Sequence, residues 1–179
     1  MKLRTRLVAF AFIAASVLSL SIVKTTAAAD LSDEQLGRIK SNCLSIKGSL
    51  NQLHATDALL RVNRGQIYEA IGTKLMSNFN ARLSNNSLDN KGLVAVTQSY
   101  QTAQVTFRDD YRIYEQQLSA ALRIDCTKEP AALHEAIESA REKRDIVHAD
   151  VLRLNQFIDD YRLAVNDFML NFDRVTGKS

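Results

Sequence analysis

The sequence is poor in residues that interrupt helices and in residues that carry the common chemistries of proteins. Its 179 residues include one proline, six glycines, two cysteines, three histidines and no tryptophan. Runs of β-branched residues are few, whereas Ala, Leu, Gln, Glu, Arg and Lys recur throughout. Because these residues favour helices, we expect an all-α protein.

The three histidines do not occur in the spacings that hold metal ions on helices. His54, His134 and His148 belong to neither a Glu-x-x-His nor a His-x-x-x-His pattern, so the di-iron and zincin signatures are missing. Asp145 stands three positions before His148, but no second pair of this kind exists. The Cys-x-x-Cys-His motif of c-type haem is also absent. We expect no metal, no cofactor and no catalytic site.

Residues 1–29 have the composition of a secretory signal peptide. Three basic residues precede an uncharged apolar run over 7–23, and the alanines at 27–29 offer the small side chains that a signal peptidase recognises. We predict cleavage before Asp30, which leaves residues 30–179 as a single domain. The alternative is an uncleaved anchor, because the apolar run reaches the lower limit of a membrane span.

Loss of this segment changes the charge of the chain. Its basic residues, Lys2, Arg4, Arg6 and Lys24, have no acidic counterparts, so 19 of the 23 basic residues remain against 20 acidic residues, a net charge of −1. Attraction to nucleic acid needs a concentrated positive field, which this balance does not provide. We predict export to the periplasm, the cell envelope or the medium, with no nucleic-acid partner and no stable membrane span after cleavage.

The first helix of the mature chain is predicted over about 32–83. Ser32 and Gln35 form a capping box at its start. A heptad-like apolar seam follows, and two of its positions are charged, Asp57 and Arg64. The pattern indicates a long helix that packs on one side.

Two further helices are predicted over about 91–124 and 130–173. In the second helix Gln104 is a polar insertion in a seam of leucine and aromatic residues. The third helix alternates apolar residues by four and three, with Arg144 as its one charged exception, a pattern typical of coiled coils. Because short turns join the three helices, we predict an elongated antiparallel three-helix bundle or coiled coil.

The two cysteines lie at nearly equal distances from the Asn-rich turn between the first two helices. Asn85, in this turn, stands almost midway in the sequence between Cys43 and Cys126. Antiparallel helices of equal length bring the two thiols level, and export leads to an oxidising compartment. We predict a Cys43–Cys126 disulfide; the alternative is two buried free thiols.

The same counting places the charged residues of the seams. Asp57 lies as far beyond Cys43 in the first helix as Arg144 lies beyond Pro130 at the start of the third. We expect a partly buried Asp57–Arg144 pair, with Arg64 and Gln104 in adjacent layers. Such pairs fix register more than they add stability. The functional alternative is a catalytic or ligand-binding acid with a basic partner.

One segment is less generic than the rest. Residues 53–69, which read Leu-His-Ala-Thr-Asp-Ala-Leu-Leu-Arg-Val-Asn-Arg-Gly-Gln-Ile-Tyr-Glu, resemble segments of uncharacterised exported all-helical proteins of bacteria. The resemblance implies export and a helical fold, and no activity accompanies it. Together these features favour a non-enzymatic exported protein that acts through protein–protein contacts, as a spacer, adaptor or assembly subunit, with an unknown partner or with itself.

Two other functions remain open from the sequence. A holdase-type chaperone or a small-ligand-binding bundle would show an exposed apolar groove between splayed helices. An enzyme of unrecognised type would need a cavity with perturbed ionisable groups. Whatever the function, we expect the turn at Ser84–Asn90 to be the more accessible end of the molecule and the first place to seek a partner.

Overall fold

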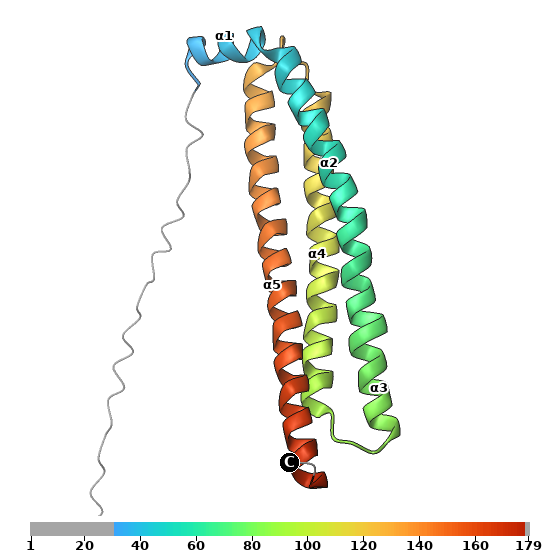
Figure 1. Cartoon of the computed structure of the whole chain (residues 1–179). Helices are drawn as coiled ribbons and strands as arrows, with labels where there is room; N and C mark the ends of the chain where they lie inside the picture. Colours follow the sequence, from blue (N-terminus) through green and yellow to red (C-terminus); the bar gives the residue numbers. More distant parts are fainter. Residues whose placement is uncertain (1–30, 178–179) are drawn as a thin grey trace, which may run out of the picture. The chain divides into compact units, whose positions relative to one another are not determined.

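The protein is helical throughout the part of the chain that the structure describes. The structure, a computed structural model, describes residues 31–177 (Figure 1). Helices and turns fill this range without any strand, which confirms the predicted all-α class. None of the helices in this range combines the length and the hydropathy that crossing a membrane requires. The predicted signal peptide, residues 1–29, lies outside the described residues.

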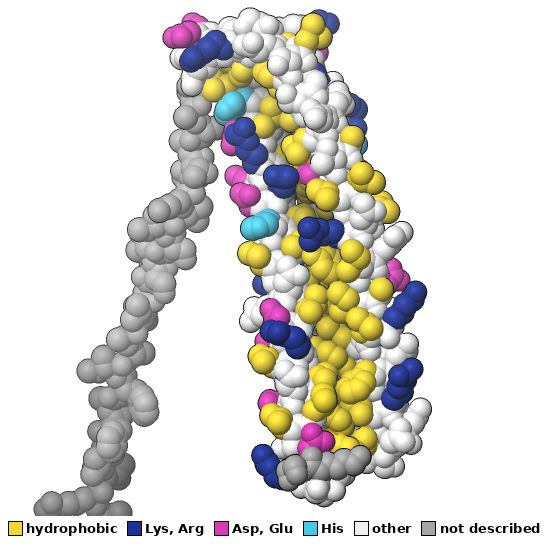
Figure 2. Space-filling view, in the orientation of Figure 1, with side chains coloured by type: hydrophobic (Ala, Val, Ile, Leu, Met, Phe, Trp, Pro, Cys, Tyr) yellow, Lys and Arg dark blue, Asp and Glu magenta, His cyan; other side chains and the backbone are white. Residues whose placement is uncertain are grey.

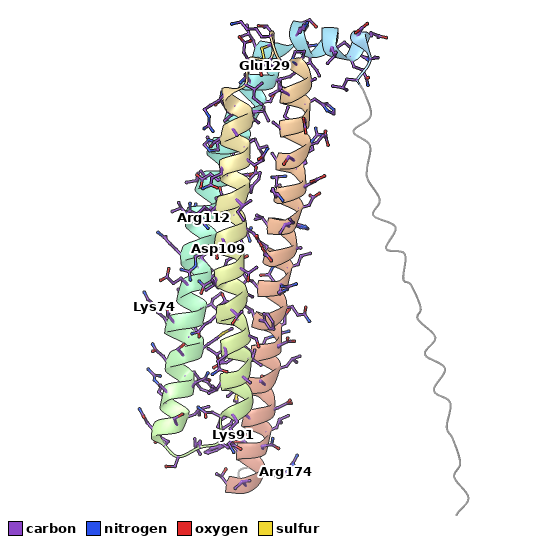
Figure 3. All side chains as sticks on the ribbon, turned by 180° about the vertical axis from the view of Figure 1, so that it is seen from behind. Lys74, Lys91, Asp109, Arg112, Glu129 and Arg174 are labelled. Carbon is purple, nitrogen blue, oxygen red and sulfur yellow. A yellow bond between two sulfur atoms is a disulfide. The ribbon has the colours of Figure 1, made fainter. Side chains whose placement is uncertain are left out.

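Three helical arms make up most of the described chain. The elements are α1 (Asp33–Ser41), α2 (Cys43–Ala70), the π-helical η1 (Ile71–Ser77), α3 (Asn78–Asn85), α4 (Lys91–Arg123) and α5 (Pro130–Thr176). No turn separates α2, η1 and α3, so we call these three elements the first arm. The first arm, α4 and α5 run side by side in both views (Figures 1 and 3), and α4 packs against the other two.

The predicted single helix over about 32–83 is wrong at its start. The capping box is present, and the Ser32 hydroxyl accepts the Gln35 N–H at 3.3 Å. However, the chain leaves helical geometry at Asn42, whose side-chain amide donates to the Arg38 carbonyl oxygen at 2.9 Å. Side-chain hydrogen bonds of this kind compete with the backbone pairing of a helix. As a result α1 lies across the end of the arms (Figure 1), where it contacts α5.

The same predicted helix is also wrong at residues 71–77, where a π-helical turn replaces regular geometry. A Cβ atom at Gly72 would lie 3.1 Å from Cε1 of Tyr100, so only glycine lets the α4 ring approach this closely. The Tyr100 hydroxyl donates to the Tyr68 carbonyl oxygen at 2.7 Å, and the Ser77 hydroxyl donates to the Gly72 carbonyl oxygen at 2.7 Å. Contacts with α4 and hydroxyl groups therefore stabilise the π-helical turn and the residues just before it.

The sulfur atoms of Cys43 and Cys126 lie at disulfide distance, as the spacing predicted, and their Cα atoms are 5.6 Å apart. Beside them the Lys47 ammonium group donates to the Ala121 and Leu122 carbonyl oxygens at the end of α4. Basic groups commonly satisfy the last carbonyl groups of a helix in this way. These contacts fix the start of the first arm to the end of α4, and we call this the disulfide end.

The opposite end, which we call the turn end, is closed by side-chain hydrogen bonds. α3 ends at Asn85, and Ser87 in the following turn has a left-handed φ of 57°. The Asn90 side-chain amide donates to the Asn80 carbonyl oxygen at 2.7 Å and to the Ser84 hydroxyl oxygen at 2.9 Å. The predicted turn is therefore tied back to α3.

The core consists of two clusters, and α4 contributes to both. The cluster toward the disulfide end contains Leu50, Tyr111, Tyr114, Leu118, Cys126, Leu133 and Ala140. The cluster toward the turn end contains Tyr68, Met76, Leu83, Leu93, Tyr100, Ala103, Phe107, Leu154 and Tyr161. Because α4 is the common element, the first arm and α5 are held mainly through it.

Candidate functional site

A charged layer joins all three arms in the half of the molecule toward the disulfide end. Asp57 of α2 is only 8 % exposed, and its Oδ2 accepts the Tyr114 hydroxyl at 2.7 Å and the Arg144 Nε at 3.0 Å. Arg144 also donates from a terminal nitrogen to Asp57 Oδ1 at 3.4 Å. We call Asp57, Tyr114 and Arg144 the charged layer. Asp57 and Arg144 were predicted to lie at the same height because they are equally far along their helices, and this pairing is observed.

The charged layer affects the acidity of its members. Burial, followed by the hydrogen bond to Asp57, raises the pKa of Tyr114 well above its usual range, so this hydroxyl stays protonated and donates. The hydrogen bond to Asp57 likewise raises the pKa of Arg144. The arrangement is therefore a fixed ion pair with a phenol donor, held at one geometry across three arms.

The other two residues predicted for this region lie elsewhere. Arg64 is exposed, about two helical turns beyond Asp57, and it does not join the charged layer. Gln104 is buried on α4, where its Oε1 would lie 3.8 Å from a Cβ atom at Gly72. Arg64 therefore lies outside the core layer predicted for it, whereas Gln104 is buried as a core residue.

A second polar layer, which the sequence analysis missed, joins the three arms toward the turn end. The Asn80 side-chain amide donates to the Thr97 hydroxyl oxygen at 2.8 Å, and the Tyr161 hydroxyl donates to Asn80 Oδ1 at 2.8 Å. The Tyr161 hydroxyl also lies 3.2 Å from the Met76 carbonyl oxygen. We call Asn80, Thr97 and Tyr161 the neutral layer. Thr97 lies between Leu93 and Tyr100 in the apolar seam of α4, and a polar residue at this seam position could have indicated a buried polar layer.

An open cavity lies beside the charged layer, between α2 and α5. Its volume is about 290 Å³. The cavity has an apolar and aromatic lining from all three arms, made of Leu60, Phe107, Tyr111, Tyr114, Val147 and Val151. Its charged and polar lining residues are Asp57, Arg61, Arg64, Arg144, Asp145 and His148. The cavity is therefore apolar at its base and mostly basic around it.

A second cavity continues the same side of the molecule toward the turn end. It has a volume of about 440 Å³ between the first arm and α5, and it is lined by Lys74, Leu75, Asn78, Phe79, Arg82, Tyr161 and Val165. Phe79, which lines this cavity, meets Phe168 of α5 edge to face, with ring centroids 6.4 Å apart. Figure 2 shows a band of apolar side chains along this face between the two arms, broadest toward the turn end and crossed by basic side chains (dark blue) nearer the disulfide end. We call the two cavities and this band the groove.

The rims of the groove carry more positive than negative charge. Five basic residues and two acidic residues line the two cavities. Asp57 is already paired with Arg144. A terminal guanidinium nitrogen of Arg61 lies 3.6 Å from a carboxylate oxygen of Glu115, and the Arg61 Cζ atom lies 5.2 Å from the centroid of the Tyr111 ring.

Three basic side chains of the first arm remain available to a ligand. Within residues 31–177, Arg64, Lys74 and Arg82 form no ion pair. All three are exposed on the rim of the groove. An occupant of the groove therefore meets unpaired positive charge along the first arm.

The described chain shows few of the arrangements that catalysis needs. No group of three His, Cys, Asp or Glu side chains within residues 31–177 is placed to hold a metal ion. His54 Nε2 lies 3.4 Å from the Ser119 hydroxyl, but no described side chain bonds the other ring nitrogen. A serine nucleophile needs a base oriented by a third group and donors for an oxyanion, so this contact alone carries no reaction.

A buried carboxyl group of α5 lies beside α4 and lines neither cavity of the groove. Asp150 is 6 % exposed, and its Oδ2 has no hydrogen-bond partner in the described chain. Burial, followed by the neighbouring Asp110 of α4, raises the pKa of Asp150 to about 6, against a smaller opposing effect of Arg153. The pair therefore takes up a proton in mildly acidic solution.

Comparison of the chain with protein-family models, with curated proteins and with solved structures found no match.

Proposed function

We propose that this protein is an exported, non-enzymatic helical-bundle protein that acts by protein–protein contact. Its partner docks an amphipathic helix in the groove between the first arm and α5. In this role the protein serves as an adaptor or assembly subunit in the cell envelope or outside the cell. The observation that carries the proposal is the apolar band between two arms that are held mainly through α4 (Figure 2).

The dimensions of the groove favour a helix as its occupant. Asp57 and Arg82 are the outermost lining residues of the two cavities on the first arm. At ~1.5 Å per residue they lie about 37 Å apart along the arm, which matches the length of a helix of about 25 residues. Helix-in-groove docking uses such a surface, with apolar anchors at every third or fourth position of the partner.

The side chains of the groove also need a cover. Leu60 and Leu75, which line the two cavities on the first arm, are 48 % and 63 % exposed. Contiguous exposed apolar surface on a soluble protein marks a site of interaction. A docked helix would remove these side chains from water.

Export is the setting that the cysteines favour. A disulfide forms and persists in an oxidising compartment. A pair at disulfide distance between Cys43 and Cys126 is consistent with such a destination. Detection of the two cysteines as a disulfide in protein recovered from the periplasm or the medium tests this part of the proposal, and retention of the protein in the cytoplasm contradicts it.

Site-specific photo-cross-linking tests the docking site in the native cell. A photoreactive residue replaces Leu75 in the groove, and the matched control is the same residue at Val105 on α4, which is 51 % exposed but lines neither cavity. We expect adducts from position 75 whose peptides map to one helical segment of one protein. No adduct at 75, or the same adducts at 75 and 105, contradicts the proposal.

A small-ligand-binding or holdase-type function is the second candidate. The exposed apolar groove, which is the feature expected of it from the sequence, and the cavity beside the charged layer both favour it. The cavity's volume of about 290 Å³ and apolar lining are near the lower end of small-molecule sites. A holdase binds many unfolded chains through apolar contact alone. Adducts spread over many proteins at position 75 would support this second candidate over a dedicated partner.

A further inference from the structure

The basic rim on the first arm limits which helix the groove accepts. Arg64, Lys74 and Arg82 follow one another at intervals of ten and eight positions along this arm. These intervals correspond to about 15 Å and about 12 Å along a helix axis. The rim on α5 is mixed, because Asp145 lies beside His148 there. Positive charge without a partner is therefore concentrated on one edge of the groove.

The charged layer adds a fixed donor at the disulfide end of the groove. Asp57 holds Arg144 through two of its nitrogens, while the Arg144 side chain is still 53 % exposed. The planar guanidinium has five N–H donors in a rigid fork. A donor that is already oriented loses little freedom when it binds, which favours affinity. Arg144 thus offers its remaining N–H groups at the edge of the cavity that Arg64 also lines.

We propose that the occupant of the groove is an acidic amphipathic helix of a partner protein, with carboxylate side chains along the edge that faces the first arm. This inference rests on the proposed function and specifies the partner. The carboxylates meet Arg64, Lys74 and Arg82 at matching intervals, and the apolar face of the helix covers the band between the arms. Complementary charge selects among helices that have similar apolar faces.

Other occupants fit the rim less well. Residues 1–29 of the chain itself include an apolar run, but they carry four basic residues and no acidic residue. They would place like charges along the basic edge. A second copy of the chain would have to offer an apolar stripe such as Leu152, Leu163 and Leu170 of α5, which are all exposed. A dimer of this kind is a distinguishable outcome of the test.

Three designed peptides test the charge rule on the purified exported protein. Each is an amphipathic helix that spans the groove, about 25 residues long at ~1.5 Å per residue, and all three share one apolar face. The first carries Glu at three edge positions that match the intervals of the basic rim, the second carries Lys there and the third carries Gln. We expect the Glu peptide to bind at least about tenfold more tightly than the Lys peptide at low salt. The difference should shrink at about 0.5 M salt, where the Debye length is only a few ångströms.

A charge-reversal variant and a matched control decide the assignment. Arg64→Glu/Lys74→Glu/Arg82→Glu should invert the preference toward the Lys peptide. The control, Lys40→Glu/Arg108→Glu/Arg123→Glu, makes the same change of net charge at exposed residues outside the groove, and it should keep the preference for Glu. All six side chains are exposed, so both variants should fold.

The outcomes separate this inference from the function on which it rests. Equal binding of the three peptides overturns the acidic partner and leaves groove docking in place. Failure of all three to bind, together with no adduct at Leu75, overturns both. Sedimentation of the protein alone as a dimer that the charge-reversal variant alters, but the control does not, assigns the groove to a second copy and also overturns the acidic partner.

Discussion

The charged layer and the neutral layer do the same structural task with different chemistry. Each joins the three arms at one level, but Arg144 of the charged layer is half exposed beside a cavity, whereas Asn80, Thr97 and Tyr161 are all buried. A neutral, buried and satisfied set of hydrogen bonds specifies how the arms pack. A charged set at the edge of an open cavity can also meet a ligand. The two layers therefore differ in charge and exposure, and the predictions below test how each contributes to the packing of the arms.

The largest expected effect concerns the pair of cysteines at disulfide distance, which lies at only one end of the described chain. The sequence separation of the pair is 83 residues, and closing a loop of this size stabilises by up to about 4 to 5 kcal/mol on the chain-entropy model. Replacing Cys43 and Cys126 by Ala should lower the free energy of unfolding by an amount approaching this figure in urea titrations. Hydrogen exchange should increase most in α1 and the first turns of α2. An equal increase at the neutral layer would contradict the contrast between the two halves.

The next effect concerns the stability that Asp57 and Arg144 contribute as a pair, compared with the loss when only one of them is replaced. Arg144→Met leaves the buried Asp57 carboxylate with Tyr114 as its remaining partner, and the loss of one member of such a pair costs about 3 kcal/mol. Asp57→Leu/Arg144→Met removes both charges and should restore most of that stability. A double-mutant cycle in urea at neutral pH measures the coupling. If Arg144→Met alone is as stable as the wild-type protein, the charged layer has no role in fixing the arms.

A third effect comes from Asp150, which lies between the two layers along α5. Its pKa is raised from 3.8 to about 6 in the folded protein, so the folded state holds this proton more tightly than the unfolded state does. Stability should therefore fall as the pH rises from about 4 through about 6, by about 2 to 3 kcal/mol in all. Asp150→Asn should remove this dependence and be the more stable protein in mildly alkaline solution. Parallel pH profiles of the two proteins would contradict the assignment.

The smallest changes in stability are expected from two matched tyrosine substitutions, one in each layer. Tyr161→Phe leaves the buried Asn80 Oδ1 without its donor, which should cost about 1 to 2 kcal/mol. Tyr114→Phe removes a charge-assisted hydrogen bond, but Asp57 Oδ2 keeps its Arg144 donor, so the cost should be similar, about 1 to 2 kcal/mol. Thermal melts of the two variants compare the layers directly. A loss for Tyr161→Phe far below the loss for Tyr114→Phe would contradict the claim that the neutral layer fixes the packing of the arms as firmly as the charged layer does.

Much of the helical architecture could be predicted from the sequence, because it depends on local signals and on period. The helices predicted over 91–124 and 130–173 begin at Lys91 and Pro130 and end close to the predicted positions, at Arg123 and Thr176. Equal spacing about the Asn-rich turn was enough to predict the pairing of Cys43 with Cys126. Each of these predictions needed only local sequence patterns, the lengths of the segments between turns and the geometry of a helix.

The remaining features depend on contacts between arms, which a single-sequence pattern does not contain. The π-helical turn accompanies the approach of Tyr100 to Gly72. The break at Asn42 depends on whether its side chain or the helix backbone makes the hydrogen bond, and the sequence pattern does not decide between the two. The groove exists because both outer arms pack on α4 while leaving each other partly uncovered, and apolar periodicity alone does not give the angle between two arms. For the same reason Arg64 was assigned to a core layer when it lies at the rim.

The central claim is that the groove between the first arm and α5 receives a helix. Titration of the isotope-labelled protein with the Glu peptide, followed by NMR chemical shifts, tests it most directly. We expect shift changes confined to groove residues such as Leu75, Phe79, Val151 and Val165, with Val105 on the outer side of α4 unchanged. Changes centred on α1, on Ser84–Asn90 or on the outer side of α4 would contradict the claim.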